Sequence, residues 1–89
     1  MSAMTDLPNI GPKLEEQLAR AGITTPEELR RTGAEDAWLH IQSFDASACL
    51  LRLSALEGAV QGIPKAQLPD RRKAELRAFY QAHKLPRKK

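Results

Sequence analysis

Apolar residues recur at three- and four-residue spacing near the start of the chain, which is the pattern of one helix face. The first such stripe consists of Ile10, Leu14, Leu18 and Ala21. Pro12 suits the first position of this helix, where a missing N–H costs nothing. Gly22 suits its end, because glycine readily takes positive φ. The pattern therefore predicts a first helix from Pro12 to about residue 21.

Two short helices are predicted next. Thr25 is the expected N-cap of the first, with Pro26 at its first helical position and Glu28 as the capping-box partner. Gly33 closes this helix and precedes a second one over about residues 34–42. The buried side of that helix is expected to hold Trp38 and Ile41.

The fourth predicted helix is apolar nearly all round. It spans residues 46–61, is capped by Asp45 or Ser47, and ends at Gly62. A helix without a broad polar face is expected at the centre of its fold.

A fifth helix is predicted to open at Pro69-Asp70, to run to about His83 and to be stopped by Pro86. One face is expected to hold Leu76, Phe79, Tyr80 and His83.

These elements predict an all-α fold, because few β-branched residues and no sustained alternation of polar and apolar residues compete with them. We expect a compact bundle of about five short helices around the central apolar helix, with a helix-hairpin-helix-like start. A chain of 89 residues is the size of one domain, so residues 1–89 are taken as a single unit with frayed tails at 1–6 and 85–89.

Composition excludes several classes of protein. Hydrophobic residues make up 42% of the chain, too many for a disordered segment. No segment approaches the ~18 apolar residues of a membrane span, so a cytoplasmic location without membrane contact is expected. The single Cys49 excludes an internal disulfide and forms no metal-binding cluster. Without a nucleophile elbow or a phosphate-binding loop, the sequence predicts neither enzyme activity nor a cofactor.

The charge is unevenly distributed. The net charge is +3, but residues 1–64 carry −4 and residues 65–89 carry +7. Such asymmetry favours an acidic partner for the basic end, the alternative being a solvated helix with a frayed tail. Lys73, Arg77 and Lys84 form a stripe along the last predicted helix, and Arg72 is a further candidate for contact with DNA phosphates.

The stretch from Leu7 to Lys13 resembles the turn of helix-hairpin-helix proteins, in which backbone N–H groups at a helix N-terminus hold a phosphate. Gly11 and Lys13 are placed for that role. The alternative is that Leu7 and Ile10 only fasten the start of the helix to the core, and nearby Asp, Glu and Pro12 favour that alternative.

A family resemblance follows from these residues. The chain is similar to the C-terminal domain of TfoX (Sxy) competence regulators. The similarity rests on Leu7 to Gly11, Leu14 to Leu18, Ala21 to Thr25 with Leu29 and Gly33, Leu53 to Ala59 with Gly62, and Leu68-Pro69 with Arg72. The resemblance implies an all-helical domain connected with the regulation of DNA uptake, through contact with a transcription activator or DNA. Full-length members carry an N-terminal α/β domain, so this chain corresponds to a stand-alone member or to part of a longer protein.

Two functions from different classes remain open. The first is a non-enzymatic regulatory module that associates with double-stranded DNA. The second is a protein-interaction domain that docks a transcription regulator or another acidic partner without DNA contact. The pattern leaves the oligomeric state undetermined. The residues proposed to contact either partner are Gly11, Lys13, Arg72, Lys73, Arg77 and Lys84.

Overall fold

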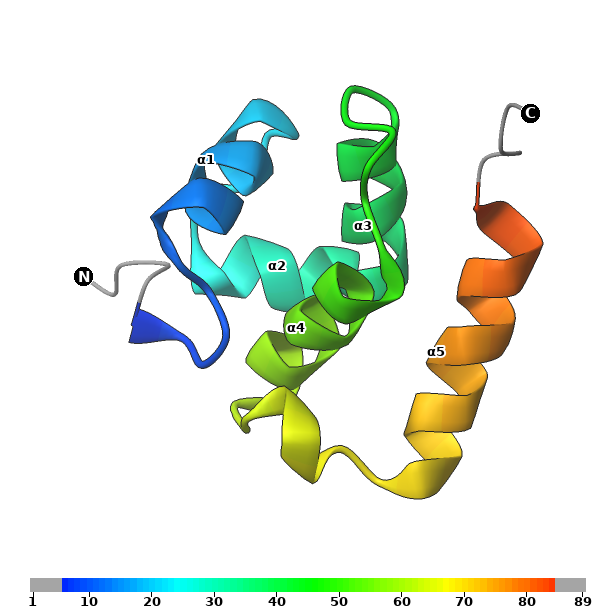
Figure 1. Ribbon diagram of the computed structural model, residues 1–89. Coiled ribbons are helices and arrows are strands. Elements are labelled where there is room, and N and C mark those ends of the chain that lie inside the picture. Colours follow the sequence, from blue (N-terminus) through cyan, green and yellow to red (C-terminus); the bar gives the residue numbers. More distant parts are fainter. Residues whose placement is uncertain (1–5, 85–89) are drawn as a thin grey trace.

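A computed structural model describes residues 6–84 of the chain. Its elements are α1 (Pro12–Arg20), α2 (Pro26–Thr32), α3 (Ala34–Gln42), α4 (Leu50–Gln61), the short 3₁₀ turn η2 (Lys65–Gln67) and α5 (Asp70–His83). Over residues 6–84 the five α-helices are accompanied by no strand, and Figure 1 shows how the helices are arranged. The predicted all-α class is therefore confirmed. The frayed tails predicted at 1–6 and 85–89, and the stop at Pro86, lie outside the described residues except for Asp6.

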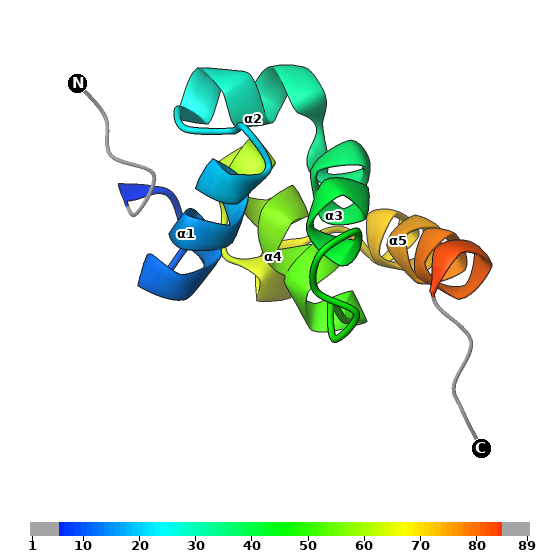
Figure 2. The ribbon, with the colours of Figure 1, turned by 90° about the horizontal axis from the view of Figure 1, so that it is seen from above.

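The fold is arranged around α4. In Figure 2, α1, α2 and α3 lie around α4, and α5 lies beyond α3 on the side away from α1. The helix α5 also contacts α4. The buried residues of this helix include Leu53, Leu56 and Ala59, each with no exposed surface. The central position predicted for the apolar segment is confirmed. Its one strongly exposed apolar residue is Leu51, which keeps 65% of its surface in contact with solvent.

The start of α4 differs from the prediction. The helix begins at Leu50 rather than residue 46, and its N-cap is Cys49 rather than Asp45 or Ser47. The Asp45 carboxylate instead accepts hydrogen bonds from the Ser47 N–H and hydroxyl, at 2.9 and 2.5 Å. This local turn at residues 46–47 satisfies the Asp45 side chain without a helix, and Cys49 is extended just before α4 begins.

The predicted cap of α2 is confirmed, with one difference in its reciprocal bond. Thr25 Oγ1 accepts from the Glu28 N–H at 3.1 Å. The Glu28 carboxylate accepts from the N–H and hydroxyl of Thr24, both at 2.9 Å, and not from the cap residue itself. These bonds from Thr24 hold the pKa of Glu28 below its ordinary value.

The apolar face of α5 packs on Trp38 of α3, and the helix also lies against α4. Leu76 is fully buried, and the rings of Phe79 and Tyr80 meet Trp38 edge-on with centroids 6.1 and 5.8 Å apart. His83 stacks on Phe79 at 4.1 Å. The face predicted for the fifth helix is therefore confirmed. Its packing fixes how α5 is rotated, and so where each basic residue of the helix points.

Candidate partner-binding surface

The residues proposed as a binding site lie in three separate places. Gly11 and Lys13 belong to the start of α1, whereas the basic residues predicted on the last helix belong to α5. Figures 1 and 2 place α1 and α5 on opposite sides of α4. On α5 itself, Arg72 lies on one flank and Lys73 with Arg77 line the other. Of the candidate residues on α5, the structure therefore brings together Lys73 and Arg77, and Lys84 lies further along the same stripe.

The turn before α1 is held by Asn9. Its backbone has φ +71°, the left-handed conformation that Asn tolerates better than most residues. Its side chain donates to the Ile63 carbonyl at 3.1 Å and accepts from the Lys65 N–H at 3.2 Å. Ile10 beside it is buried. These contacts fasten the turn to the end of α4, as expected from the core-anchoring alternative.

Gly11 has no steric reason to be glycine. Its φ of −96° is open to any residue, and no heavy atom outside its neighbours would lie within 4 Å of an added Cβ. It caps α1 without a side-chain hydrogen bond, and the Lys13 side chain is exposed. The N-terminus of α1 thus carries backbone donors, although Pro12 removes one of them.

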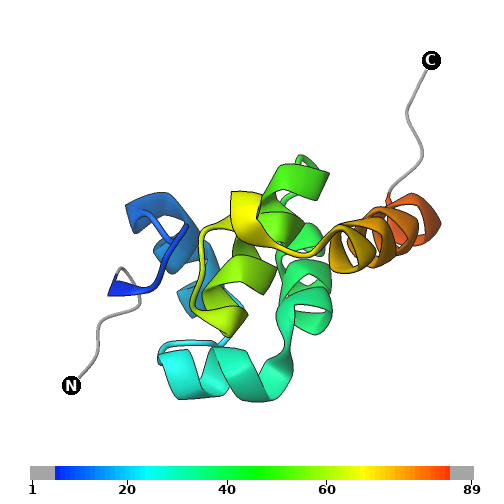
Figure 3. The same ribbon diagram turned by 90° about the horizontal axis from the view of Figure 1, so that it is seen from below.

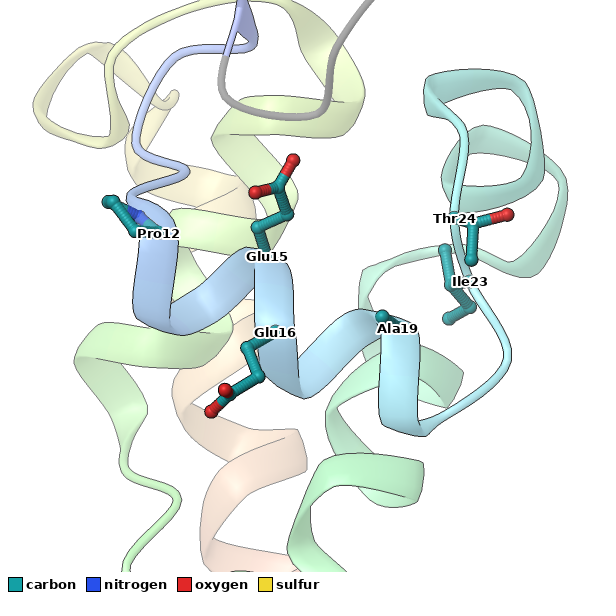
Figure 4. A pocket seen from close by; sticks show the side chains of 6 residues that line it. All are labelled: Pro12, Glu15, Glu16, Ala19, Ile23 and Thr24. Atoms are coloured by element: carbon teal, nitrogen blue, oxygen red, sulfur yellow. The ribbon is translucent and has the colours of Figure 1, made fainter.

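An acidic cleft adjoins this end of α1 (Figure 4). Its volume is about 290 Å³, and its lining residues are Pro12, Glu15, Glu16, Ala19, Ile23 and Thr24. In the close-up the Glu15 and Glu16 side chains leave the helix in different directions. Two carboxylates beside the N-terminus raise the cost of bringing a phosphate there.

Arg72 is engaged by three carboxylates from three helices. Its guanidinium nitrogens lie 2.9 Å from Glu57, 3.1 Å from Glu75 and 3.4 Å from Glu35. Burial raises the pKa of Glu57, but hydrogen bonds from Arg72 and Gln61 hold it below its ordinary value. The hydrogen bond to Glu57 raises the pKa of Arg72. Arg72 therefore joins α5 to α3 and α4, and this contact accounts for its position without an external ligand.

A groove with basic walls lies on the other flank of α5. Its volume is about 300 Å³. The lining residues, here named the basic groove, are Leu50, Leu51 and Ser54 from α4, Lys65 and Ala66 from η2, and Lys73 and Arg77 from α5. Figure 3 shows η2 against α4 and the chain crossing from η2 to α5. The groove thus joins three segments, and no carboxylate is among its lining residues.

The cations of the basic groove differ in whether the structure holds them in place. Lys73 is half-buried, and its ammonium donates to the Ala66 carbonyl at 3.2 Å, which holds it at the wall. Lys65 and Arg77 are exposed, and among residues 6–84 no carboxylate forms an ion pair with either. The groove therefore presents one positioned charge and two adjustable ones.

Lys84 extends the stripe toward the end of α5. Its ammonium lies 5.9 Å from the centroid of the Tyr80 ring, within the range of a cation–π contact. It is also the C-cap residue of the helix, where a positive charge is favoured by the helix dipole. These two interactions account for Lys84 locally, and it does not line the groove.

Sequence reasoning missed Lys65 and Leu51. A signal for Leu51 was present, because consecutive leucines on a helix differ by about 100° in direction and cannot both face one core. Leu50 and Leu51, with Ser54 one turn later, are the residues of α4 that line the groove. For Lys65 there was no such signal, since its place depends on how η2 folds back on α4.

Within residues 6–84, no group of three or more His, Cys, Asp or Glu side chains is arranged to hold a metal ion. None of the described helices is long and apolar enough to cross a lipid bilayer. The fold and surface thus define a small all-helical domain whose clearest surface feature is a basic groove with an apolar floor.

The chain belongs to the TfoX C-terminal domain family, whose model matches residues 1–80. Protein Sxy of Escherichia coli (strain K12) is 38% identical over 73 residues, which cover 82% of this chain and 35% of Sxy. The chain therefore spans about a third of the length of that relative. The family resemblance inferred from the sequence is confirmed.

Two crystal structures from Listeria monocytogenes share the fold. One, of an uncharacterized protein in a triclinic form, has a TM-score of 0.90 and 47% identity, covering 91% of this chain and 92% of the other. The second, of a protein of unknown function in a tetragonal form, has a TM-score of 0.87 and 48% identity, covering 89% and 96%. The helical arrangement is thus shared with relatives of similar length.

Proposed function

We propose that this domain is a non-enzymatic regulatory module of the competence-regulator type, which acts by docking an acidic protein partner in the basic groove. Membership of the TfoX C-terminal domain family supports the regulatory part of the proposal. The observation that carries the docking part is the composition of the groove, in which an apolar floor is flanked by three cations.

The exposed floor favours protein over DNA as the occupant. Leu51 is 65% exposed at the groove. Burying it against an apolar side chain is favourable by ~25 cal/mol per Å² of surface removed from water, whereas a hydrated phosphate offers no such contact. Protein interfaces typically combine an apolar centre with a polar rim, and the groove likewise combines Leu50 and Leu51 with the cations Lys65, Lys73 and Arg77.

Duplex DNA is the second candidate, and one observation favours it. Lys73, Arg77 and Lys84 follow one another at intervals of four and seven residues along one side of α5 and its C-cap, and residues 65–89 carry +7. A row of cations can follow a phosphate backbone without reading bases. In that case Lys73→Ala with Arg77→Ala should weaken binding to every duplex and reduce the salt slope by up to ~2.

A pull-down with and without nuclease separates the two candidates. The tagged chain is compared with a groove variant, Lys65→Glu with Arg77→Glu, and with a control of equal charge, Arg30→Glu with Arg71→Glu, at exposed residues outside the groove. Arg71 is a suitable control because its side chain is 91% exposed and it does not line the groove. We expect a specific protein that survives nuclease treatment, is lost with the groove variant and is kept by the control.

The binding is then repeated with the purified partner, and duplex DNA is titrated by fluorescence anisotropy across a salt series. Capture that disappears on nuclease treatment, together with DNA binding that falls in the groove variant, would replace the docking proposal with the DNA candidate. Equal losses in both double variants would mean that overall charge alone is responsible, and docking in the groove would be rejected.

A further inference from the structure

We infer that the occupant of the basic groove is a short amphipathic helix with acidic residues beside its apolar stripe. This inference rests on the proposed docking function and names the structural class of the bound segment. It follows from the shape of the groove, the residues that line it and the placement of its charges.

The groove is suited to side chains rather than to a whole small molecule. Its volume of about 300 Å³ is at the lower limit of small-molecule sites, and its lining contains no aromatic residue. Leu51 is largely exposed beside Ser54, so the floor is open to solvent along α4. A ligand that lies across this floor can remove Leu51 from water while its remaining surface stays hydrated.

Among the modes of peptide recognition, helix-in-groove is the one that uses both the apolar floor and the open furrow. Addition of a strand needs an exposed sheet edge, and residues 6–84 contain no strand. Recognition of a proline-rich segment needs an aromatic-lined groove, and the lining here is Leu, Ser, Ala, Lys and Arg. Two packed helices, α4 and α5, instead provide a furrow in which a third helix can lay its apolar face.

The cations determine the charge pattern of the bound helix. Lys73 and Arg77 stand one turn apart on α5, and Lys65 comes from η2. A helix seated over Leu51 therefore meets positive charge from two segments, α5 and η2. Carboxylates three or four residues apart lie on one side of a helix, so two acidic pairs bordering leucines complement this pattern.

The test uses a fluorescein-labelled synthetic peptide of ~15–20 residues, long enough to form a helix in isolation. It carries leucines at helical spacing with glutamates on both borders. One control peptide replaces the glutamates with lysines, and another replaces the leucines with glutamines. Binding is measured by anisotropy, and amide chemical shifts identify the surface that is contacted.

We expect the acidic peptide to bind saturably, with shifts concentrated at Leu51, Ser54 and Arg77, and neither control peptide to bind comparably. Leu51→Ser should weaken binding about tenfold, since burial of one such side chain is worth roughly that factor. Lys65→Glu with Arg77→Glu should weaken it by a similar factor or more. Arg30→Glu with Arg71→Glu, which changes the net charge equally at exposed residues outside the groove, should change affinity less than about threefold.

Two results would overturn the helix inference. One is absence of acidic-peptide binding while the purified partner still binds through the groove, in which case docking stands and the occupant is not helical. The other is peptide binding that Leu51→Ser leaves unchanged and that both charge variants weaken equally, which indicates attraction by net charge. If the groove variant binds both the purified partner and the peptide as tightly as the unsubstituted chain does, the proposed function is rejected together with the inference.

Discussion

Replacing Gly58 by alanine should destabilise this domain, although Gly58 lies inside a helix. At an ordinary helical site this change stabilises by ~0.5–1 kcal/mol, because glycine loses more backbone freedom on folding. Here a Cβ would lie 2.7 Å from the Ile63 carbonyl oxygen and closer still to the Asn9 side-chain nitrogen. At Gly58, α4 and the turn before α1 approach each other closely.

The magnitude follows from what must move. Asn9 donates to the Ile63 carbonyl and accepts from the Lys65 N–H, so displacing it disturbs both bonds. Each bond contributes ~0.5–1.5 kcal/mol, and overpacking costs a further ~1–3 kcal/mol. After the helical gain is subtracted, the expected loss is about 2 kcal/mol. For a domain of this size that lowers Tm by roughly 8–16 °C.

Thermal melting followed by circular dichroism, with urea unfolding to measure the free energy, tests this prediction. Gly11→Ala is the matched control: its Cβ meets no atom within 4 Å, so stability should stay within ~0.5 kcal/mol of the unsubstituted chain. Asn9→Ala should cost less in the Gly58→Ala background than alone, because its bonds are already disturbed. A Gly58→Ala variant that melts at or above the temperature of the unsubstituted chain would refute the close approach.

Three further predictions concern stability. Leu53→Ala should cost ~2–5 kcal/mol in urea unfolding, because this side chain is fully buried in α4; an unchanged midpoint would contradict the central position of the helix. Thr25→Ala should lower stability by ~1 kcal/mol in the same measurement, since it removes the acceptor for the Glu28 N–H, whereas Thr25→Ser should retain most of it. The pKa of Glu57 is lowered in the folded state. The stability that Glu57 contributes is therefore fully present above its unfolded pKa of ~4.3 and is lost as pH falls through the folded pKa. Glu57→Gln should therefore reduce the free energy of unfolding at pH 7 and make it depend less on pH below about pH 4.3. Urea unfolding from pH 3 to 7 measures both effects. If stability falls with acid as steeply in the variant as in the unsubstituted chain, other carboxyl groups cause that loss.

The sequence alone determined the helices and the fold class. Thr25, Pro26 and Glu28 lie within four residues of one another, and the bond from the Glu28 N–H to Thr25 forms as the pattern requires. Gly33 and Gly62 stand at helix ends with φ of +85° and +77°. Caps and stops act over one turn of chain, so they can be read without knowledge of packing.

The start of α4 was decided by the tertiary structure. Asp45 was a reasonable helix cap, but its second carboxylate oxygen accepts from Gln17 at 2.6 Å and from Arg52 at 2.9 Å. Bonds from Ser47, and then from Gln17 and Arg52, hold the pKa of Asp45 well below its ordinary value. Ser47 lies only two residues from Asp45, but Gln17 lies 28 residues away, so only the folded structure shows that the second carboxylate oxygen is also engaged.

Tertiary packing also determined which of the candidate residues face the groove. Arg72 and Lys73 are neighbours with equal charge, and the sequence made both candidates for one partner. Packing of Leu76 and the aromatic residues on α3 sets the rotation of α5, which turns Arg72 toward Glu57 and Lys73 toward the basic groove. Neighbours on a helix point about 100° apart, so rotation about the axis determines which cation forms an internal pair and which faces the groove. That rotation depends on contacts between residues far apart in the chain, and only the folded structure supplies it.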